Sequence, residues 1–408
     1  MTATEPVHDW AKDFDVLDPS YVADPFGIWA ELRGRCPIAH TDRRGPTWMP
    51  TRYEDVTAIA HDVEHFSSRR IAVIPLQENG GDESGRVADD GPSLEYGLPP
   101  ISADPPLHTW TRRLLLPWFS HRRVAYYLPF TQEICRHLLD QLDGAQEVDA
   151  AVDYAQQIPV RVIAHVLGVP LDMSDTFTEW VRGVLEFADD EEKRRHGILS
   201  IIEYLVNQLQ ARREQPGDDL LSELLGTEVD GKPLEDSVVL GMAVLLLIAG
   251  IDTTWSAIGS SLWHLATNPE DRERMVAEPD LMPVAVEELL RAYSPVTMAR
   301  VVTDDVEYAG CPMRTDDKVL MNFPAANRDP EVFEDPDSVH LDREHNRHVA
   351  FGSGIHRCAG SNLARMELHV ALEEWLARIP KFSLVPSKPV TWAGGQVRGP
   401  RVLPIQIG

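Results

Sequence analysis

The sequence has few of the residues that build disulfide frameworks or attract nucleic acid. Its 408 residues contain four cysteines, with no Cys-x-x-Cys pair and no Cys/His quartet at zinc-finger spacing, so neither a disulfide framework nor a structural zinc is expected. Lysine and arginine number 38 against 65 acidic residues, which gives a formal net charge of −27. Because so acidic a chain has no overall attraction for phosphate backbones or anionic bilayers, we expect no nucleic-acid and no membrane partner.

A secretory leader and a long hydrophobic run are also lacking. Residues 1–10 are polar and acidic, with no basic stretch followed by an apolar core. The longest apolar run covers residues 238–251, which is short for a membrane span and is typical of a buried core helix. With 43% hydrophobic and 25% charged residues, the composition is that of an ordinary globular protein. We therefore expect a reduced, soluble, cytoplasmic protein.

Helical patterns dominate the chain between residues 106 and 295. Apolar spacing and stop signals predict helices over residues 53–61, 108–116, 124–142, 154–167 with a kink at Pro159, 175–187, 192–213, 236–267 with Asp236 as N-cap, 282–293, and from 361 onward. Short strands or turns are expected over 48–51, 300–302, 306–309 and 319–322. These patterns favour one mainly α domain with a minor β part over residues 1–408, with a mixed N-terminal part to about 105 and small sheets over 296–408. Residues 71–100 predict a long functional loop or, alternatively, a disordered linker.

A cysteine in a glycine-rich stretch, Phe351 to Gly360, is the strongest chemical signal. Cys358 comes just before a predicted helix, where backbone N–H groups and the helix dipole favour the thiolate. The glycines, among them Gly352 and Gly354, allow a tight turn and a close approach of a flat ligand. A thiolate in this setting suits a soft metal, and on haem iron it favours O–O cleavage. The alternative is a buried structural cysteine on a turn.

Polar residues interrupt the long apolar helix at Ala249-Gly250-Ile251-Asp252-Thr253-Thr254. An acid and two threonines are costly in an apolar stretch unless they are hydrogen-bonded or functional. A threonine hydroxyl can bond to the carbonyl four residues earlier and make room for a small ligand. The alternative is an acid and threonines that only cap or bend the helix.

Two spaced pairs of polar residues complete the set of candidates. Glu288 and Arg291 share a helix face at i, i+3 and can form a salt bridge. His108 and Arg112 share a face at i, i+4. Taken singly, each pair could be an ordinary solvated helix surface.

The pattern Phe-x-x-Gly-x-x-x-Cys-x-Gly, matched by Phe351, Gly354, Cys358 and Gly360, resembles the haem-binding loop of the cytochrome P450 superfamily. The other landmarks follow in the family's order: the acid–threonine motif, Glu288-x-x-Arg291, and Arg343 at the position that completes a structural lock with that pair. The resemblance implies the P450 fold, mainly α with a minor β part, in which a long central helix lies over the haem and the cysteine loop lies beneath it.

The resemblance also assigns roles to individual residues. It implies that Cys358 is the metal ligand, that Thr253 hydrogen-bonds the bound O₂, and that Asp252 relays protons to it. It further implies a haem-binding set in which the first four residues contact the propionates: His108, Arg112, Arg300, His356, Ala249, Gly250, Phe351, Gly352, Cys358 and Gly360.

By the same resemblance the chain is an oxidoreductase, a haem b monooxygenase that inserts one atom of O₂ into a small apolar organic substrate. No flavin or iron–sulfur domain follows the cysteine loop, so electrons are expected from a separate ferredoxin and ferredoxin reductase, with NAD(P)H acting only through them. Residues 340–369 hold four arginines, five histidines and three acids, which favours docking of an acidic ferredoxin. Substrate contacts are expected from residues 71–100, 177–187, 245–249, 296–298 and 394–397.

Two alternatives stay open at this point. One is a peroxide-driven or isomerising haem–thiolate enzyme that needs no electron donor, and the intact Asp252–Thr253 pair argues against it. The other is a non-catalytic haem or gas-binding protein.

Overall fold

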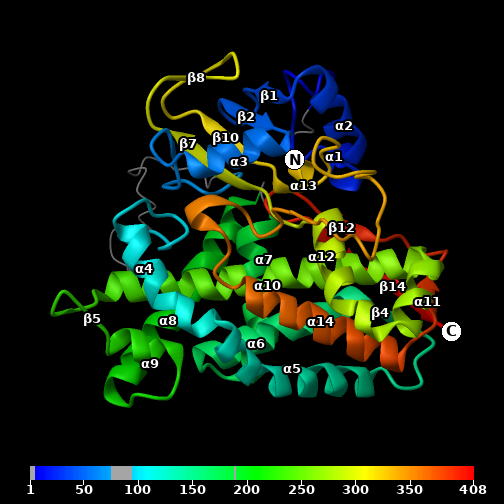
Figure 1. Ribbon diagram of the computed structural model, residues 1–408. Helices are drawn as coiled ribbons and strands as arrows, with labels where there is room; N and C mark the ends of the chain where they lie inside the picture. Colours follow the sequence, from blue (N-terminus) through cyan, green and yellow to red (C-terminus); the bar gives the residue numbers. More distant parts are fainter. Residues whose placement is uncertain (1–4, 75–93, 188–189) are drawn as a thin grey trace. The chain divides into compact units, whose positions relative to one another are not determined.

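Figure 1 shows the computed structural model, which describes residues 5–74, 94–187 and 190–408. Most of the long loop expected over 71–100, namely residues 75–93, lies outside the described residues. The chain forms two compact units. Unit 1 comprises residues 1–75, 283–358 and 392–399, and unit 2 comprises residues 76–282, 359–391 and 400–408. The single domain over 1–408 stays a prediction.

Unit 1 is built around a mixed five-stranded sheet in the order β1-β2-β10-β7-β3. Only the β2–β10 pair is parallel, with Val319 opposite Trp48; the other neighbours are antiparallel. The bounds are α1 Pro19–Ala23, α2 Phe26–Arg35, β1 Ile38–Thr41, β2 Thr47–Pro50, α3 Tyr53–His61, β3 Phe66–Ser67, α12 Met282–Ala292, β7 Met298–Val302, β8 Val306–Tyr308, β9 Cys311–Met313, β10 Lys318–Met321, α13 Phe323–Ala326, the 3₁₀ turn η5 Gly354–His356, and β12 Thr391–Ala393.

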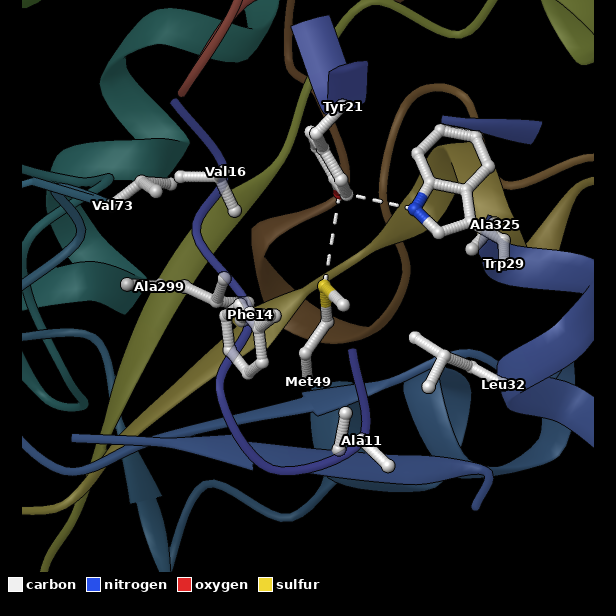
Figure 2. Packing of buried hydrophobic residues seen from close by; sticks show 12 residues of the cluster. Ala11, Phe14, Val16, Tyr21, Trp29, Leu32, Met49, Val73, Ala299 and Ala325 are labelled. Carbon is white, nitrogen blue, oxygen red and sulfur yellow. Dashed lines mark hydrogen bonds between the residues drawn. The ribbon is translucent and has the colours of Figure 1, made fainter. Parts of the chain in front are cut away.

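Figure 2 shows the core that joins the N-terminal segment of unit 1 to this sheet. The Tyr21 hydroxyl accepts a 3.0 Å hydrogen bond from Trp29 Nε1 and donates to Met49 Sδ at 3.7 Å. Burial raises the pKa of Tyr21 to about 12, so the phenol stays neutral inside the core. The two aromatic rings meet edge to face, with centroids 6.0 Å apart. This packing anchors the chain before β1.

Unit 2 is mainly helical, with a small antiparallel sheet in the order β11-β14-β4. Its bounds are α4 Leu107–Leu115, η1 Leu116–Phe119, α5 His121–Gln141, β4 Glu147–Asp149, the π-helical turn η2 Ala150–Ala155, α6 Gln157–Leu167, η3 Leu171–Met173, α7 Ser174–Glu186, α8 Glu191–Glu214, α9 Leu220–Leu225, β5 Glu228–Val229, β6 Lys232–Pro233, α10 Asp236–Thr267, α11 Pro269–Ala277, η4 Pro279–Leu281, α14 Ser361–Arg378, β11 Phe382–Leu384 and β14 Pro404–Ile407. Strand β13, Gly399–Val402, joins the two units along the chain. Helix α10 packs against α6, α7, α8 and α14, so it is the central helix of this unit.

The apolar sequence of α10 is explained by burial. Its mean hydropathy and length would allow a membrane span, but 72% of its most apolar window is buried inside the structure, as in a core helix. The prediction that Asp236 caps this helix is wrong by one position. Glu235 holds the N-cap position without a side-chain hydrogen bond, and Asp236 is the first helical residue, where its charge still favours the helix dipole. Asn268 and Pro269 end the helix as expected.

The predicted kink at Pro159 is also wrong. The segment 154–167 is not one helix, because the π-helical turn η2 ends at Ala155 and α6 starts at Gln157. Pro159 therefore lies in the first turn of α6, where a backbone N–H has no intrahelical partner to lose. Gly168 ends α6 in the left-handed conformation, with φ +70°.

Candidate active site

The cysteine loop of unit 1 is closed by its own backbone. Gly352 N–H donates to Val349 O at 2.8 Å, and Cys358 N–H donates to Phe351 O at 2.7 Å. Gly352 and Gly354 have φ of +74° and +70°, a conformation that side chains disfavour. A Cβ on Gly354 would lie 2.2 Å from Ala60 O in α3, so the loop needs glycine there for space as well as for conformation. The result is a cysteine that is exposed on a loop of defined shape.

Two of the expected propionate partners lie in the same unit. His356 is held through Nε2, which lies 2.8 Å from the hydroxyl oxygen of the buried Ser68. The sequence contained no signal for Ser68, because 288 residues separate the pair. Arg300 in β7 is 4% exposed, and its Nη1 donates to Ala299 O at 2.8 Å. A buried guanidinium and an oriented imidazole are the donors that a carboxylate requires.

The predicted lock around Glu288 is present in full. Arg291 donates to both oxygens of Glu288 at 2.8 Å, and Arg343 Nε donates to Oε2 at 2.9 Å. His340 N–H and Asn346 Nδ2 add bonds of 2.9 and 3.1 Å to the same carboxylate. Burial would raise the pKa of Glu288, but the hydrogen bonds and charge of its partners outweigh it and hold the pKa below its usual value. These bonds tie α12 to the segment before the cysteine loop, and they occupy Arg343.

Unit 2 contains the other candidates, beginning with α4 and α10. His108 is buried and Arg112 half-buried on the same face of α4. On α10, residues 238–248 and 254–262 are buried, whereas Ala249 is exposed and Gly250 and Thr253 are partly exposed. The Thr253 hydroxyl donates to Ala249 O at 3.0 Å, which is the hydrogen bond to the carbonyl four residues earlier that the sequence predicts. These three small residues form a narrow accessible strip in the middle of the helix, between two stretches that are buried.

Asp252, next to this strip, is 1% exposed and ion-paired. Its Oδ1 accepts a 2.7 Å bond from Nη2 of Arg401, a residue of β13 that sequence reasoning missed. Burial raises the pKa of Asp252 to about 6; the charge of Arg401 opposes this rise, and that of Glu186 adds to it. A carboxyl with a pKa near neutrality is suited to accept and release protons under ordinary conditions.

Each of the two units, taken by itself, carries groups whose chemistry fits a haem. Unit 1 presents an exposed thiol on a glycine-shaped loop, and thiolate is a known axial ligand of haem iron. Gly360 holds the N-cap position of α14 in unit 2, two residues after that thiol. The accessible strip of α10 has no large side chain to prevent the approach of a flat ring. Each unit taken by itself therefore carries groups that suit a haem–thiolate protein.

Comparison with known proteins agrees with this class. The family model described as Cytochrome P450 matches residues 186–389. Nocardicin C N-oxygenase of Nocardia uniformis subsp. tsuyamanensis is 38% identical over 366 residues, covering 88% of this chain and 89% of that protein. Mycinamicin IV hydroxylase/epoxidase of Micromonospora griseorubida is 35% identical, with coverages of 93% and 94%. The crystal structure of CYP109E1 from Bacillus megaterium in complex with testosterone has a TM-score of 0.84 at 29% identity, covering 94% of this chain and 98% of that one.

The chain therefore belongs to the cytochrome P450 family. It is an oxidoreductase, a monooxygenase that uses haem and O₂. The predicted family, fold class and enzyme class are confirmed, whereas the roles of the individual site residues stay predictions.

Proposed function

We propose that the protein inserts one oxygen atom of O₂ into a small apolar organic molecule, with haem b ligated by Cys358. When bound, the haem supplies the activation of O₂, and its thiolate ligand favours O–O cleavage. The observation that carries the proposal is the exposed Cys358 on a loop whose shape depends on Gly352 and Gly354. His108, Arg112, Arg300 and His356 are proposed to bind the two propionates, and Ala249, Gly250, Phe351, Gly352 and Gly360 to complete the haem-binding surface.

The acid–threonine pair is proposed to manage protons. The Thr253 hydroxyl donates to Ala249 O at 3.0 Å, a local hydrogen bond that it can exchange for a bond to O₂. Asp252, with a pKa of about 6, accepts and releases a proton near neutral pH. Together they would deliver the protons that the reduction of one oxygen atom to water consumes.

Electrons are proposed to come from a ferredoxin and its reductase, which are supplied by NAD(P)H, in the cytoplasm. Because Arg343 is bound to Glu288, the arginines proposed to attract an acidic ferredoxin are the exposed Arg347 and Arg357. The rival, a peroxide-driven or isomerising enzyme, predicts turnover without any reductant. The test compares turnover with the ferredoxin system and turnover with peroxide as the sole oxidant. Product formed only with the ferredoxin system supports the monooxygenase.

The proposed substrate class is a medium-sized apolar compound. It rests on the aliphatic sequence of α10 before Ala249 and on the similarity to CYP109E1, whose crystal structure is a complex with testosterone. The test is an optical titration of the purified ferric protein with terpenes, steroids, fatty acids and aromatic acids. A saturable low-spin to high-spin change identifies the substrate class. A purified protein that binds no haem would contradict the whole proposal.

The proton role is tested with Thr253→Ala. We expect reducing equivalents to be consumed with less product and more peroxide released, because the hydroxyl that holds O₂ is lost. Thr267→Ala is the matched control: its hydroxyl makes the same bond to the carbonyl four residues earlier, Trp263 O at 2.9 Å, at the end of the same helix. Tight coupling in both variants would refute the role of Thr253.

A further inference from the structure

Arg401 is the centre of a buried network in unit 2. The residue is 8% exposed, and each of the three guanidinium nitrogens donates a hydrogen bond to a different side chain. Nη2 donates to Asp252 Oδ1 at 2.7 Å, Nη1 donates to Ser256 Oγ at 2.9 Å, and Nε donates to Glu186 Oε1. The Trp255 ring lies against the same guanidinium, 4.3 Å from its carbon. Such a group has little freedom to turn.

The backbone of β13 is brought to α10 by a glycine. A Cβ on Gly259 would lie 2.8 Å from Cγ of Pro400, the residue before Arg401. Ser256 follows Asp252 by one helical turn, so both present their side chains on one side of α10. The guanidinium therefore spans one turn of the helix and is anchored at both ends.

This arrangement makes the two oxygens of the Asp252 carboxyl unequal. Oδ1 is occupied by Arg401, whereas Oδ2 is buried and accepts no hydrogen bond from the part of the chain that the structure describes. A buried oxygen without a donor is the oxygen on which a proton is best placed, because protonation there leaves the hydrogen bond from Arg401 to Oδ1 in place.

We propose that Arg401 is the positioning residue of Asp252: by holding Oδ1, it leaves Oδ2 as the oxygen of that carboxyl that takes and gives a proton. The inference rests on the proposed relay role of Asp252 and adds the residue that orients it. Glu186, at the end of α7, accepts from Nε of the same guanidinium, and its negative charge offsets part of the effect of Arg401 on Asp252.

The charged groups around Asp252 allow opposite predictions for two variants. Among the described residues, those that act on it are Arg401 of β13 and Glu186 and Arg182 of α7. Arg401→Gln removes an adjacent opposite charge and is expected to raise the pKa of Asp252 by about one to three pH units. Glu186→Gln removes a nearby like charge, so it is expected to lower that pKa. If these residues only stabilised the fold, the two substitutions would not shift the pKa of Asp252 in opposite directions.

The experiment is a pH titration of the haem-loaded enzyme by infrared spectroscopy, following the protonated carboxyl band that is lost in Asp252→Asn. We expect a midpoint near the pKa of about 6 in the wild type, a higher midpoint in Arg401→Gln and a lower one in Glu186→Gln. Arg401→Lys keeps the charge and is expected to stay near the wild type, which keeps the test usable if Arg401→Gln does not fold.

Unchanged midpoints in Arg401→Gln and Glu186→Gln, or shifts in the same direction, would overturn the proposal. The relay role of Asp252 is tested separately, by the coupling of electron consumption to product in Asp252→Asn. Intact coupling there would refute the relay even with the expected infrared shifts, so the two failures are distinguishable.

Discussion

Replacement of Arg291 by lysine tests how strongly the Glu288 lock holds unit 1. Arg291 is fully buried and makes five hydrogen bonds: two to Glu288, and one each to the backbone carbonyls of Asn327, Pro336 and Ser338 at 2.7–2.9 Å. Lysine carries the same charge but has three N–H donors on one nitrogen, so at least two of the five acceptors lose their donor.

The expected loss follows from the acceptors left unpaired in the buried site. Two or three unmet acceptors at about 1–3 kcal/mol each give a decrease in the free energy of unfolding of about 4 kcal/mol. Urea denaturation followed by far-ultraviolet circular dichroism measures it. The matched control is Arg314→Lys, where the arginine is exposed and pairs with Asp305 at 2.9 Å, and for which a much smaller loss is expected because water screens the pair. If Arg291→Lys lost less than about 1 kcal/mol, the bonding pattern would not be what stabilises this region.

Two further variants test the cysteine loop and the buried acid. Gly354→Ala should lower both the free energy of unfolding, by ~3 kcal/mol, and the haem content, because its Cβ would lie 2.2 Å from Ala60 O; Gly310→Ala, with φ +79° and open space, should cost only ~1 kcal/mol. Asp252 has a pKa of about 6 in the folded protein, against an ordinary value of 3.8 for an aspartate in the unfolded chain. Between these two pH values the folded state binds more protons than the unfolded state, so the stability of the protein falls as the pH rises. Asp252→Asn should abolish this fall of ~3 kcal/mol in denaturation curves recorded across that pH range, whereas a fall as steep as in the wild type would contradict the raised pKa.

Local patterns in the sequence predicted most of the elements that carry the site. The apolar run and the Asn268–Pro269 stop predicted α10, and the hydrogen bond from Thr253 to Ala249 O followed from the spacing of four residues between them. The errors were of one kind. Asp236 as N-cap and the kink at Pro159 both depended on where a helix begins, which differs by a residue or two with the packing around its first turn.

The arrangement around the candidate site could be predicted only in part. Family order placed Glu288, Arg291 and Arg343 together, and their bonds agree with it. The partners of His356 and Asp252 carried no such signal, because Ser68 and Arg401 lie 288 and 149 residues away along the chain. Neither is part of a recognisable motif.

The sequence by itself determined the residues that can do chemistry: a cysteine before a helix, an acid and a threonine within an apolar run, and glycines where the backbone must turn. These depend on spacing of a few residues, which helix and turn geometry convert directly into shared faces and tight loops. Only the tertiary structure decided that a C-terminal arginine would hold one oxygen of Asp252 and that burial would raise its pKa to about 6. Both depend on which distant strand packs against α10, and therefore on the packing of the whole unit rather than on any local pattern.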